Sequence, residues 1–434
     1  MVFRSQIMEK QRSLGVWAAA ALGVGSMVGA GIFSIFGTAS HIAGNAVYVS
    51  FGLAGFIILF TVYSYAKLST RFPSAGGPVE YIAVGLGENV VTGAVHIILW
   101  FGYIIGIALF AKGFSNYAST FPIFQSDLSF WKLVLEHAVI VFFLFLNFLG
   151  SKILGRTELY IVVFKVAVLF LFAISGAIVA DFKMLSPEKF PEINAVIYCI
   201  SIVYLAYMGF GVITTSAEDI KDPRVNLPRA LYLSVIIVLV IYILVSVAVL
   251  GNLSVPEIVK AKDYALAEAC RPILGHVGFV AIVITAMIST ASAINAYLYG
   301  GGHVCVVMAE KKQLPRFMAK TLTSEGSYGL LFTGLLAIFF INFANLSEIA
   351  VLGAATFMIV YVVVNISHLK LIGETGANRG MIVIALVTSI LAFLALMIYS
   401  YEASPRSLVI IFVMCLLSVG FEGVFGVMLK KSEI

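Results

Sequence analysis

Charged residues are scarce in this sequence. Asp, Glu, Lys and Arg make up only 11% of the 434 residues, whereas 61% are hydrophobic. Soluble domains are about 25% charged and about 45–50% apolar, so the composition excludes both a water-soluble globule and a disordered chain. The net charge of +5 includes no basic block longer than the pair Lys311 and Lys312, and we therefore expect no nucleic-acid partner.

Cysteines and catalytic motifs are scarce as well. The four cysteines form no C-x-x-C pattern, so the sequence offers no framework for disulfides or a metal site, and we expect neither a metal ion nor a cofactor. No G-x-x-x-x-G-K-[ST] motif is present, which argues against ATP-driven transport within this chain. The His and Ser residues of the apolar segments do not cluster as a nucleophile and its base would, so we predict that the chain is not an enzyme.

Long apolar runs dominate what remains. A helix of about 20 residues crosses the hydrocarbon core of a membrane, and twelve runs approach or exceed this length. They span residues 14–41, 46–68, 88–118, 132–149, 157–180, 192–216, 228–250, 272–304, 328–343, 346–367, 380–399 and 407–429. The sequence therefore predicts an all-α integral membrane protein with twelve transmembrane helices.

The basic residues between these runs predict the orientation. With the N-terminus inside, the inner segments hold 18 of the 27 Lys and Arg residues and the outer loops hold 8. Because positive charge favours the cytoplasmic side, both terminal segments, 1–13 and 430–434, are predicted to be cytoplasmic. We expect a multi-pass protein of the cell (plasma) membrane whose inner loops touch anionic lipid.

Glycine interrupts the first and the sixth run. Four glycines, at 23, 25, 29 and 31, lie in the middle of the first run, and the sixth contains Gly209 and Gly211. Small residues also allow close helix packing, which is the alternative interpretation. The density of glycine favours unwound segments, which a membrane tolerates only where they line a cavity.

The two interrupted runs each begin a set of five. Because five is odd, the second set must cross the membrane upside down relative to the first. We predict inverted repeats over residues 14–180 and 192–368, with peripheral helices over 380–429. Breaks at matching positions of inverted repeats are typical of transporter binding sites. The freed N–H groups favour a carboxylate and the freed carbonyls favour an ammonium, so an α-amino acid fits both.

Two stretches carry a family resemblance. Residues 25–33, GSMVGAGIF, and residues 204–230, which begin YLAYMGFG, resemble the first helix and the sixth helix with its following loop in the amino acid–polyamine–organocation superfamily. The resemblance implies the leucine-transporter fold, with helices 1–5 and 6–10 as the inverted repeats and helices 1 and 6 unwound in mid-membrane.

The resemblance also implies a substrate site. It puts the substrate carboxylate on the backbone amides of three residues, Gly29, Ala30 and Gly31. It puts the amino group on the carbonyls of Met27, Leu205 and Met208. Val28, Gly209 and Phe210 complete the predicted site, and Phe210 is either an aromatic lid or a packing residue.

One position departs from the family pattern. Many relatives carry Asp or Glu directly after the Gly-aromatic pair, where this sequence has Gly211. A buried cationic side chain needs a carboxylate partner, so we predict neutral L-amino acids as substrates, with broad specificity.

Lys165 is a single lysine inside the fifth apolar run, with no acidic residue expected at the same depth. A charge there is costly and marks a functional candidate, although snorkelling toward the interface or a structural ion pair are alternatives. Sodium-coupled members of the fold hold sodium between helices 1 and 8. The matching groups here are the carbonyls of Gly25 and Val28, with Ala286, Ser289 and Thr290 in helix 8. We predict that the ammonium of Lys165 replaces sodium and carries the transported proton.

These observations predict a proton-coupled, sodium-independent secondary transporter of amino acids that works by alternating access. Its partners would be the substrate, protons and lipid. The alternatives are an amino acid/polyamine exchanger, a channel or a solute sensor on the same fold.

Overall fold

The computed structural model describes residues 14–149, 151–323 and 326–426, without the side chains of Ala30 and of residues 151–157. The predicted cytoplasmic ends, 1–13 and 430–434, lie outside the described residues. Within the described part the chain is helical throughout and has no strand, only two isolated bridges that pair Leu14 with Ile220 and Thr321 with Ser327.

The helices differ widely in length, and several short ones adjoin long ones. In chain order they are α1 (Val16–Ala30), α2 (Phe36–Ala43), α3 (Val47–Arg71), α4 (Pro78–Leu86), α5 (Val90–Ala118), α6 (Leu128–Leu149), α7 (Ser151–Val179), α8 (Ile193–Val203), the 3₁₀ helix η6 (Tyr204–Phe210), α9 (Gly211–Thr215), α10 (Pro223–Leu250), α11 (Val255–Ala261), α12 (Ala265–Glu310), α13 (Tyr328–Phe340), α14 (Leu346–Lys370), α15 (Ile372–Thr375), α16 (Arg379–Ala403) and α17 (Pro405–Phe421). Further short 3₁₀ segments connect them.

The predicted membrane spans are helical. The described residues contain ten apolar helical stretches long enough to cross a membrane and two shorter ones, Val16–Gly29 and Tyr328–Phe340. The all-helical multi-pass fold predicted from composition and run length is therefore confirmed. The division into the repeats 14–180 and 192–368 and the peripheral pair 380–429 remains a prediction.

Both predicted interruptions are present. α1 ends at Ala30, the turn 31–35 follows, and α2 begins at Phe36. In the sixth span, the tighter 3₁₀ helix η6 separates α8 from α9. An α-helix therefore gives way to another backbone conformation twice, once in each predicted repeat.

The glycines of the first span have two different roles. Gly23, Gly25 and Gly29 lie inside α1, and a Cβ on each would lie within 2.5 Å of a side-chain atom of a neighbouring helix. Close packing, the alternative interpretation, thus accounts for these three. Only Gly31 lies in the break itself. Glycine density therefore predicts the position of the break only to within a few residues. Close helix packing and unwinding both favour glycine, so the sequence does not tell the two apart.

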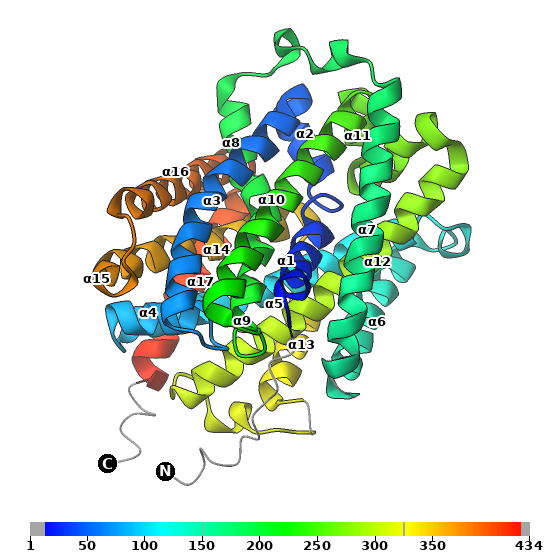
Figure 1. Cartoon of the computed structure of the whole chain (residues 1–434). Coiled ribbons are helices and arrows are strands. Elements are labelled where there is room, and N and C mark those ends of the chain that lie inside the picture. Colours follow the sequence, from blue (N-terminus) through cyan, green and yellow to red (C-terminus); the bar gives the residue numbers. More distant parts are fainter. Residues whose placement is uncertain (1–13, 150, 324–325, 427–434) are drawn as a thin grey trace, which may run out of the picture.

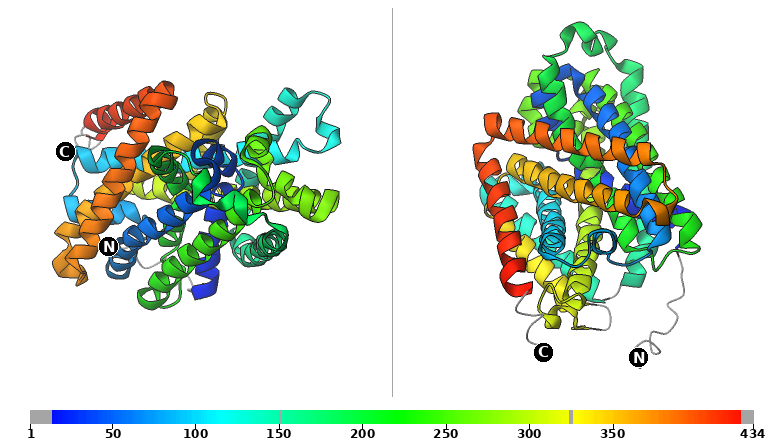
Figure 2. Two further views of the ribbon diagram at one scale, coloured as in Figure 1. Left: turned by 90° about the horizontal axis from the view of Figure 1, so that it is seen from above. Right: turned by 90° about the vertical axis from the view of Figure 1, so that its left-hand side faces the viewer.

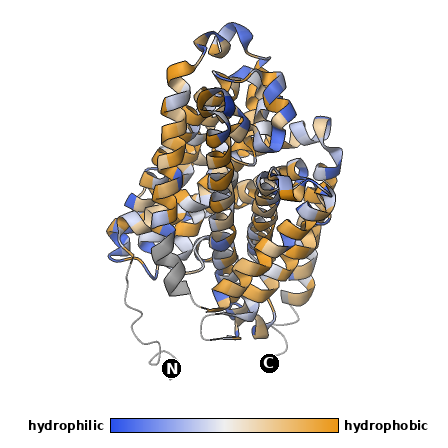
Figure 3. Cartoon of the chain, turned by 90° about the vertical axis from the view of Figure 1, so that its right-hand side faces the viewer, coloured by the Kyte–Doolittle hydropathy of each residue, from blue (hydrophilic) through white to orange (hydrophobic). Residues whose placement is uncertain are grey.

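The interrupted helix α1 lies in the interior of the bundle, and the exterior is apolar. α1 and α10 lie between α6 and α7 on one side and α15 and α16 on the other (Figures 1 and 2). Figure 3 shows hydrophobic residues along the helices and polar residues toward their ends. The lipid-facing character is clearest for large hydrophobic side chains that are more than half exposed on outer helices: Phe142, Phe145, Leu171, Leu416 and Leu417.

Candidate functional site

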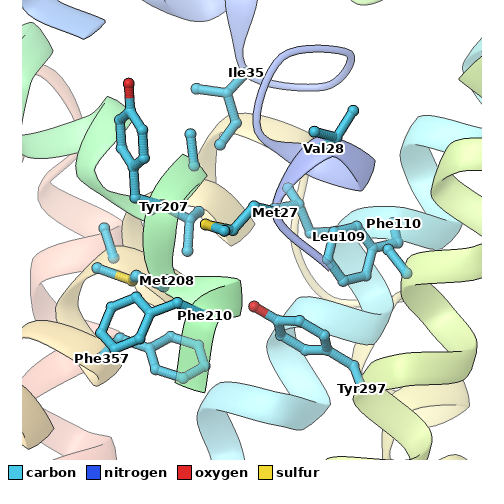
Figure 4. Packing of buried hydrophobic residues seen from close by; sticks show 14 of the residues in the cluster. Met27, Val28, Ile35, Leu109, Phe110, Tyr207, Met208, Phe210, Tyr297 and Phe357 are labelled. Carbon is cyan, nitrogen blue, oxygen red and sulfur yellow. The ribbon is translucent and has the colours of Figure 1, made fainter. Parts of the chain in front are cut away.

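The two broken helices lie in direct contact, through a side-chain hydroxyl and through a close approach of their backbones. The Ser26 hydroxyl donates to the carbonyl oxygen of Gly209 at 2.8 Å, which connects α1 to η6. A Cβ on Gly209 would lie 2.7 Å from the backbone nitrogen of Met27, so only glycine permits this approach. Figure 4 shows Met27 between Met208 and Phe210 of η6 on one side and Phe110 of α5 on the other. The predicted substrate-binding residues of the two breaks are therefore neighbours.

Tyr242 of α10 joins the two breaks. Its buried hydroxyl lies 2.6 Å from the Met27 carbonyl oxygen and 3.1 Å from that of Ala206. Gly31 makes room for it, since a Cβ there would lie 2.0 Å from the Tyr242 hydroxyl oxygen. Sequence reasoning missed Tyr242, one of 19 tyrosines, because no motif or spacing relates it to residues more than two hundred positions earlier.

Two of the three carbonyls predicted to hold the substrate amino group already accept a tyrosine hydroxyl. Met27 accepts from Tyr242, and Met208 accepts from Tyr361 of α14 at 3.3 Å. Each of these oxygens also accepts a backbone N–H, from Gly31 and Gly211, so both lone pairs are used and an ammonium would have to displace the phenol. Leu205, the third, packs against Gly353 of α14.

The amides predicted to hold the carboxylate lie at the end of α1. Gly29 and Ala30 belong to its last turn, and the Gly31 N–H donates to the Met27 carbonyl oxygen at 3.1 Å. The Gly31 amide is thus used within the helix end in this conformation. The side chain of Ala30 lies outside the described part of the structure.

Aromatic rings surround η6. Phe210 is fully buried, stacks on Tyr361 at 5.5 Å between ring centroids and meets Tyr65 edge-on at 5.1 Å. Of the two predicted roles for Phe210, packing is the one that these contacts describe. Gly211, next in sequence, is buried, yet no atom lies within 4 Å of where its Cβ would be. Open space therefore adjoins the position of the absent carboxylate.

Lys165 is fully buried in α7 and points at α1. Its Nζ donates to the Gly25 carbonyl oxygen at 2.8 Å, which excludes snorkelling. The Ser289 hydroxyl of α12 lies 3.5 Å from the Val28 carbonyl oxygen. The Thr290 hydroxyl instead donates to its own helix, at Ala286, 2.8 Å away. The structure thus brings Lys165 to Gly25 and places Ser289 beside Val28, but it turns Thr290 away.

The expectation that no acidic residue faces Lys165 is wrong. Glu158 of α7 is buried, interacts electrostatically with Lys165, and accepts a hydrogen bond of 2.5 Å from the Ser292 hydroxyl of α12. Seven residues are about two helical turns, so both side chains lie on one face of the helix. The i, i+7 spacing is the signal that the sequence offers, and Glu158 shows no sign of burial there because it lies near the start of its apolar run.

These features define a class of protein. A lipid-facing helical bundle whose two broken helices meet at its centre, with freed backbone groups held by buried polar side chains, is a membrane transporter. More specifically, the chain belongs to the amino acid permease family, whose family model matches residues 14–421. The resemblance to the amino acid–polyamine–organocation superfamily is confirmed.

Individual relatives extend over most of the chain. It is 38% identical over 394 residues to an uncharacterized protein of Methanocaldococcus jannaschii, with 90% of each chain covered. It is 31% identical over 422 residues to the inner membrane transport protein YbaT of Escherichia coli, with 97% of each covered. It is 26% identical over 363 residues to the chloroplastic cationic amino acid transporter 7 of Arabidopsis thaliana, covering 76% of this chain and 61% of the relative.

Replacing Gly31 with valine should abolish substrate binding. The Cβ of valine would lie 2.0 Å from the Tyr242 hydroxyl oxygen. The collision would force Tyr242 or residue 31 to move and break the hydrogen bond from Tyr242 to the Met27 carbonyl. Gly29→Val should act similarly, because its Cβ would lie 2.3 Å from the Cβ of Ala293. Binding to purified protein is the measurement. Gly420→Val in α17, where a Cβ meets nothing within 4 Å, is the control. Wild-type affinity in the Gly31 variant would remove this break from the site.

Replacing Tyr242 with phenylalanine should destabilise the ligand-free protein. The change removes the one hydroxyl donor shared by the Met27 and Ala206 carbonyls, although Met27 keeps the Gly31 N–H, and the lost hydrogen bond costs about 1 kcal/mol. The apparent melting temperature in detergent should fall clearly below that of Tyr198→Phe, whose hydroxyl contacts Glu402 at the exposed end of α16. Equal melting temperatures for the two variants would show that the Tyr242 bridge contributes little.

Proposed function

We propose that this permease is a secondary active transporter of neutral L-amino acids with broad specificity, driven by protons and independent of sodium. The proposed location is the cell membrane, with both termini cytoplasmic. The observation that carries the proposal is the contact of the Lys165 ammonium with the Gly25 carbonyl, 2.8 Å away, in a fully buried position between α1 and α7.

The contact supports a coupling role because it joins a titratable group to the helix that must move. In sodium-coupled members of the fold, which the sequence resembles, sodium lies between helices 1 and 8. Lys165 brings a positive charge to a carbonyl of that region, and Ser289 of α12, the eighth membrane span of the sequence, lies beside Val28. A ligand shifts a conformational balance only by interacting differently with the two states. A proton on Lys165 does so, since it turns a dipolar contact with α1 into a charged one.

The substrate class follows from what surrounds the breaks. Backbone N–H and carbonyl groups recognise the amino acid core without regard to its side chain. Val16–Ala30, Val90–Ala118 and Ile193–Thr215 contain no Asp or Glu, and Gly211 faces open space. The names of relatives do not single out one substrate, because they include a cationic amino acid transporter of Arabidopsis thaliana and a methylthioribose transporter of Bacillus subtilis, 27% identical over 368 residues.

The alternatives differ in measurable ways. An exchanger moves labelled substrate only when unlabelled substrate is present on the other side. A channel dissipates gradients without saturating, and a sensor binds without transport. Uptake of labelled amino acids into proteoliposomes, with empty and preloaded lumens, separates all of these from proton-driven accumulation.

Placing a carboxylate at Gly211 should change the substrate preference. Gly211→Asp fills the open space with a negative charge, which a cationic side chain needs when buried. Inhibition of alanine uptake by arginine should strengthen at least about tenfold, since one new charged contact contributes about 1.5–3 kcal/mol. Gly211→Asn, of the same shape without the charge, is the matched control. If the Asp and Asn variants gave the same competition, the inference from Gly211 would be wrong.

An inward acid gradient should drive uptake by the wild type in sodium-free buffer. Lys165→Ala should fold but lose this transport, because it removes the proton-binding group. Lys165→Arg should also lose it, since arginine keeps its proton. Labelled alanine uptake under an imposed pH gradient is the measurement, with size-exclusion profiles to verify folding. A strict sodium requirement in the wild type, or equal accumulation by Lys165→Ala, would contradict the proposed coupling.

A further inference from the structure

Lys165 is not the only buried titratable group against the first helix. Glu158 shares its helix face, and both converge on Gly25 of α1. We infer that Glu158 is the second proton-holding group of the coupling site: Lys165 and Glu158 share one proton, and Glu158 is the group that passes it to the inner water. This inference rests on the proposed proton coupling and extends it to a residue pair.

Gly25 is the point where the two side chains meet. Lys165 donates to its carbonyl oxygen at 2.8 Å, and the Glu158 carboxylate lies so close that a Cβ on Gly25 would be 2.3 Å from Oε1. The missing side chain of Gly25 thus makes room for the carboxylate. Lys165 and Glu158 both contact α1, the helix that ends at the first break. A change in the protonation of either residue therefore changes the electrostatic interaction with α1.

Charge balance explains why a buried lysine needs this partner. With one proton shared, the pair is neutral whether the proton is on Nζ, leaving Lys⁺ and Glu⁻, or on the carboxyl, leaving two uncharged groups. Nζ of Lys165 bonds to Gly25 and Oε1 of Glu158 to Ser292, and the described residues show no ion pair between the two groups, so in this proposal the proton moves through an intervening water. An Nζ–H bond breaks, an Oε–H bond forms, and nothing is oxidised or reduced. An unpaired charge in an apolar interior is costly, and the pair avoids it in both forms.

Ser292 suits a carboxyl group that gains and loses a proton. Its hydroxyl lies 2.5 Å from Oε1 of Glu158. A hydroxyl donates to a carboxylate and can also accept from a carboxylic acid, so the contact between α7 and α12 survives in both states. Within the described residues, the groups that act on Glu158 are Lys165 from its own helix and Ser292 from α12, and α1 contributes the backbone of Gly25.

The positions of the two residues along α7 indicate the direction in which the proton would move. Glu158 precedes Lys165 by two helical turns, about 10 Å along the axis at 1.5 Å per residue. It therefore lies nearer the start of α7, which the Lys and Arg distribution places on the cytoplasmic side. A proton taken by Lys165 leaves through Glu158 when the inner half of α1 moves away and admits water.

The test compares Glu158→Gln with wild type in proteoliposomes, using the full chain and labelled alanine. Glutamine keeps the shape and the contact with Ser292 but cannot hold the proton. A proton on Lys165 would then be an unpaired buried charge, so Lys165 stays neutral and still reaches Gly25. Exchange at equal pH should remain within about threefold of wild type and become insensitive to pH, whereas accumulation driven by a pH gradient should fall at least tenfold.

Glu136→Gln is the matched control. Glu136 is also a buried glutamate with a lysine and a serine, Lys112 at 3.4 Å and Ser115 at 3.1 Å, but it joins α6 to α5 away from Gly25. Its variant should accumulate alanine as wild type does. Glu158→Asp, which is shorter but titrates, should recover part of the accumulation that Glu158→Gln loses.

The outcomes separate this inference from the proposed function. If wild type accumulates alanine with the pH gradient and Glu158→Gln does so equally, the inference is wrong and the proposed function stands. If wild type itself shows no such accumulation, both are wrong. Should Glu158→Gln not fold, Ser292→Ala tests the same point, because losing the donor should shift the pH profile of accumulation by about half a unit. An unchanged profile would overturn the inference.

Discussion

Lipid offers no hydrogen-bond partners, so every backbone group that a helix break frees must find a partner within the protein. Several carbonyls at the two breaks have such partners. Ser26 holds the carbonyl of Gly209, Tyr242 holds those of Met27 and Ala206, and Tyr361 holds that of Met208. A transporter needs backbone groups that can be released to a substrate. Phenol and serine hydroxyls suit this purpose, because each can be displaced by a better donor without leaving a buried charge.

The same constraint explains why glycine lies wherever a polar group or a backbone of another element approaches closely. Gly31 lies opposite the Tyr242 hydroxyl, Gly209 opposite the backbone of Met27, and Gly25 opposite the Glu158 carboxylate. At each place the absence of a side chain on glycine leaves room for a group of another element to come close. The two breaks are thus packed closely against the elements around them.

Buried charge obeys a similar rule. Lys165 and Glu158 are both enclosed by protein, and each lowers the cost of burying the other. An ion pair of a partly buried lysine with a buried glutamate, Lys112 with Glu136, lies between α5 and α6. The two pairs differ in what they touch: only the first contacts the helix that contains a break. The proposed coupling role of Lys165 and Glu158 therefore rests on the helix that they contact and not on the presence of two opposite charges.

The sequence by itself determined the helical, membrane-spanning architecture and the location of both breaks, because apolar run length and glycine placement are local consequences of the hydrocarbon core and of backbone sterics. It also singled out Lys165, since a lone charge in an apolar run is visible without any neighbour. It did not reveal Tyr242, Tyr361 or the role of Ser292, which act on residues far away in the chain. It misjudged Glu158, and it offered Ser289 or Thr290 as partners of Lys165, whereas the Thr290 hydroxyl donates to its own helix. Only the tertiary structure decided these partners, because which side chain satisfies a freed carbonyl depends on how distant helices pack, and residues of common type in unrelated helices carry no local signal of that packing.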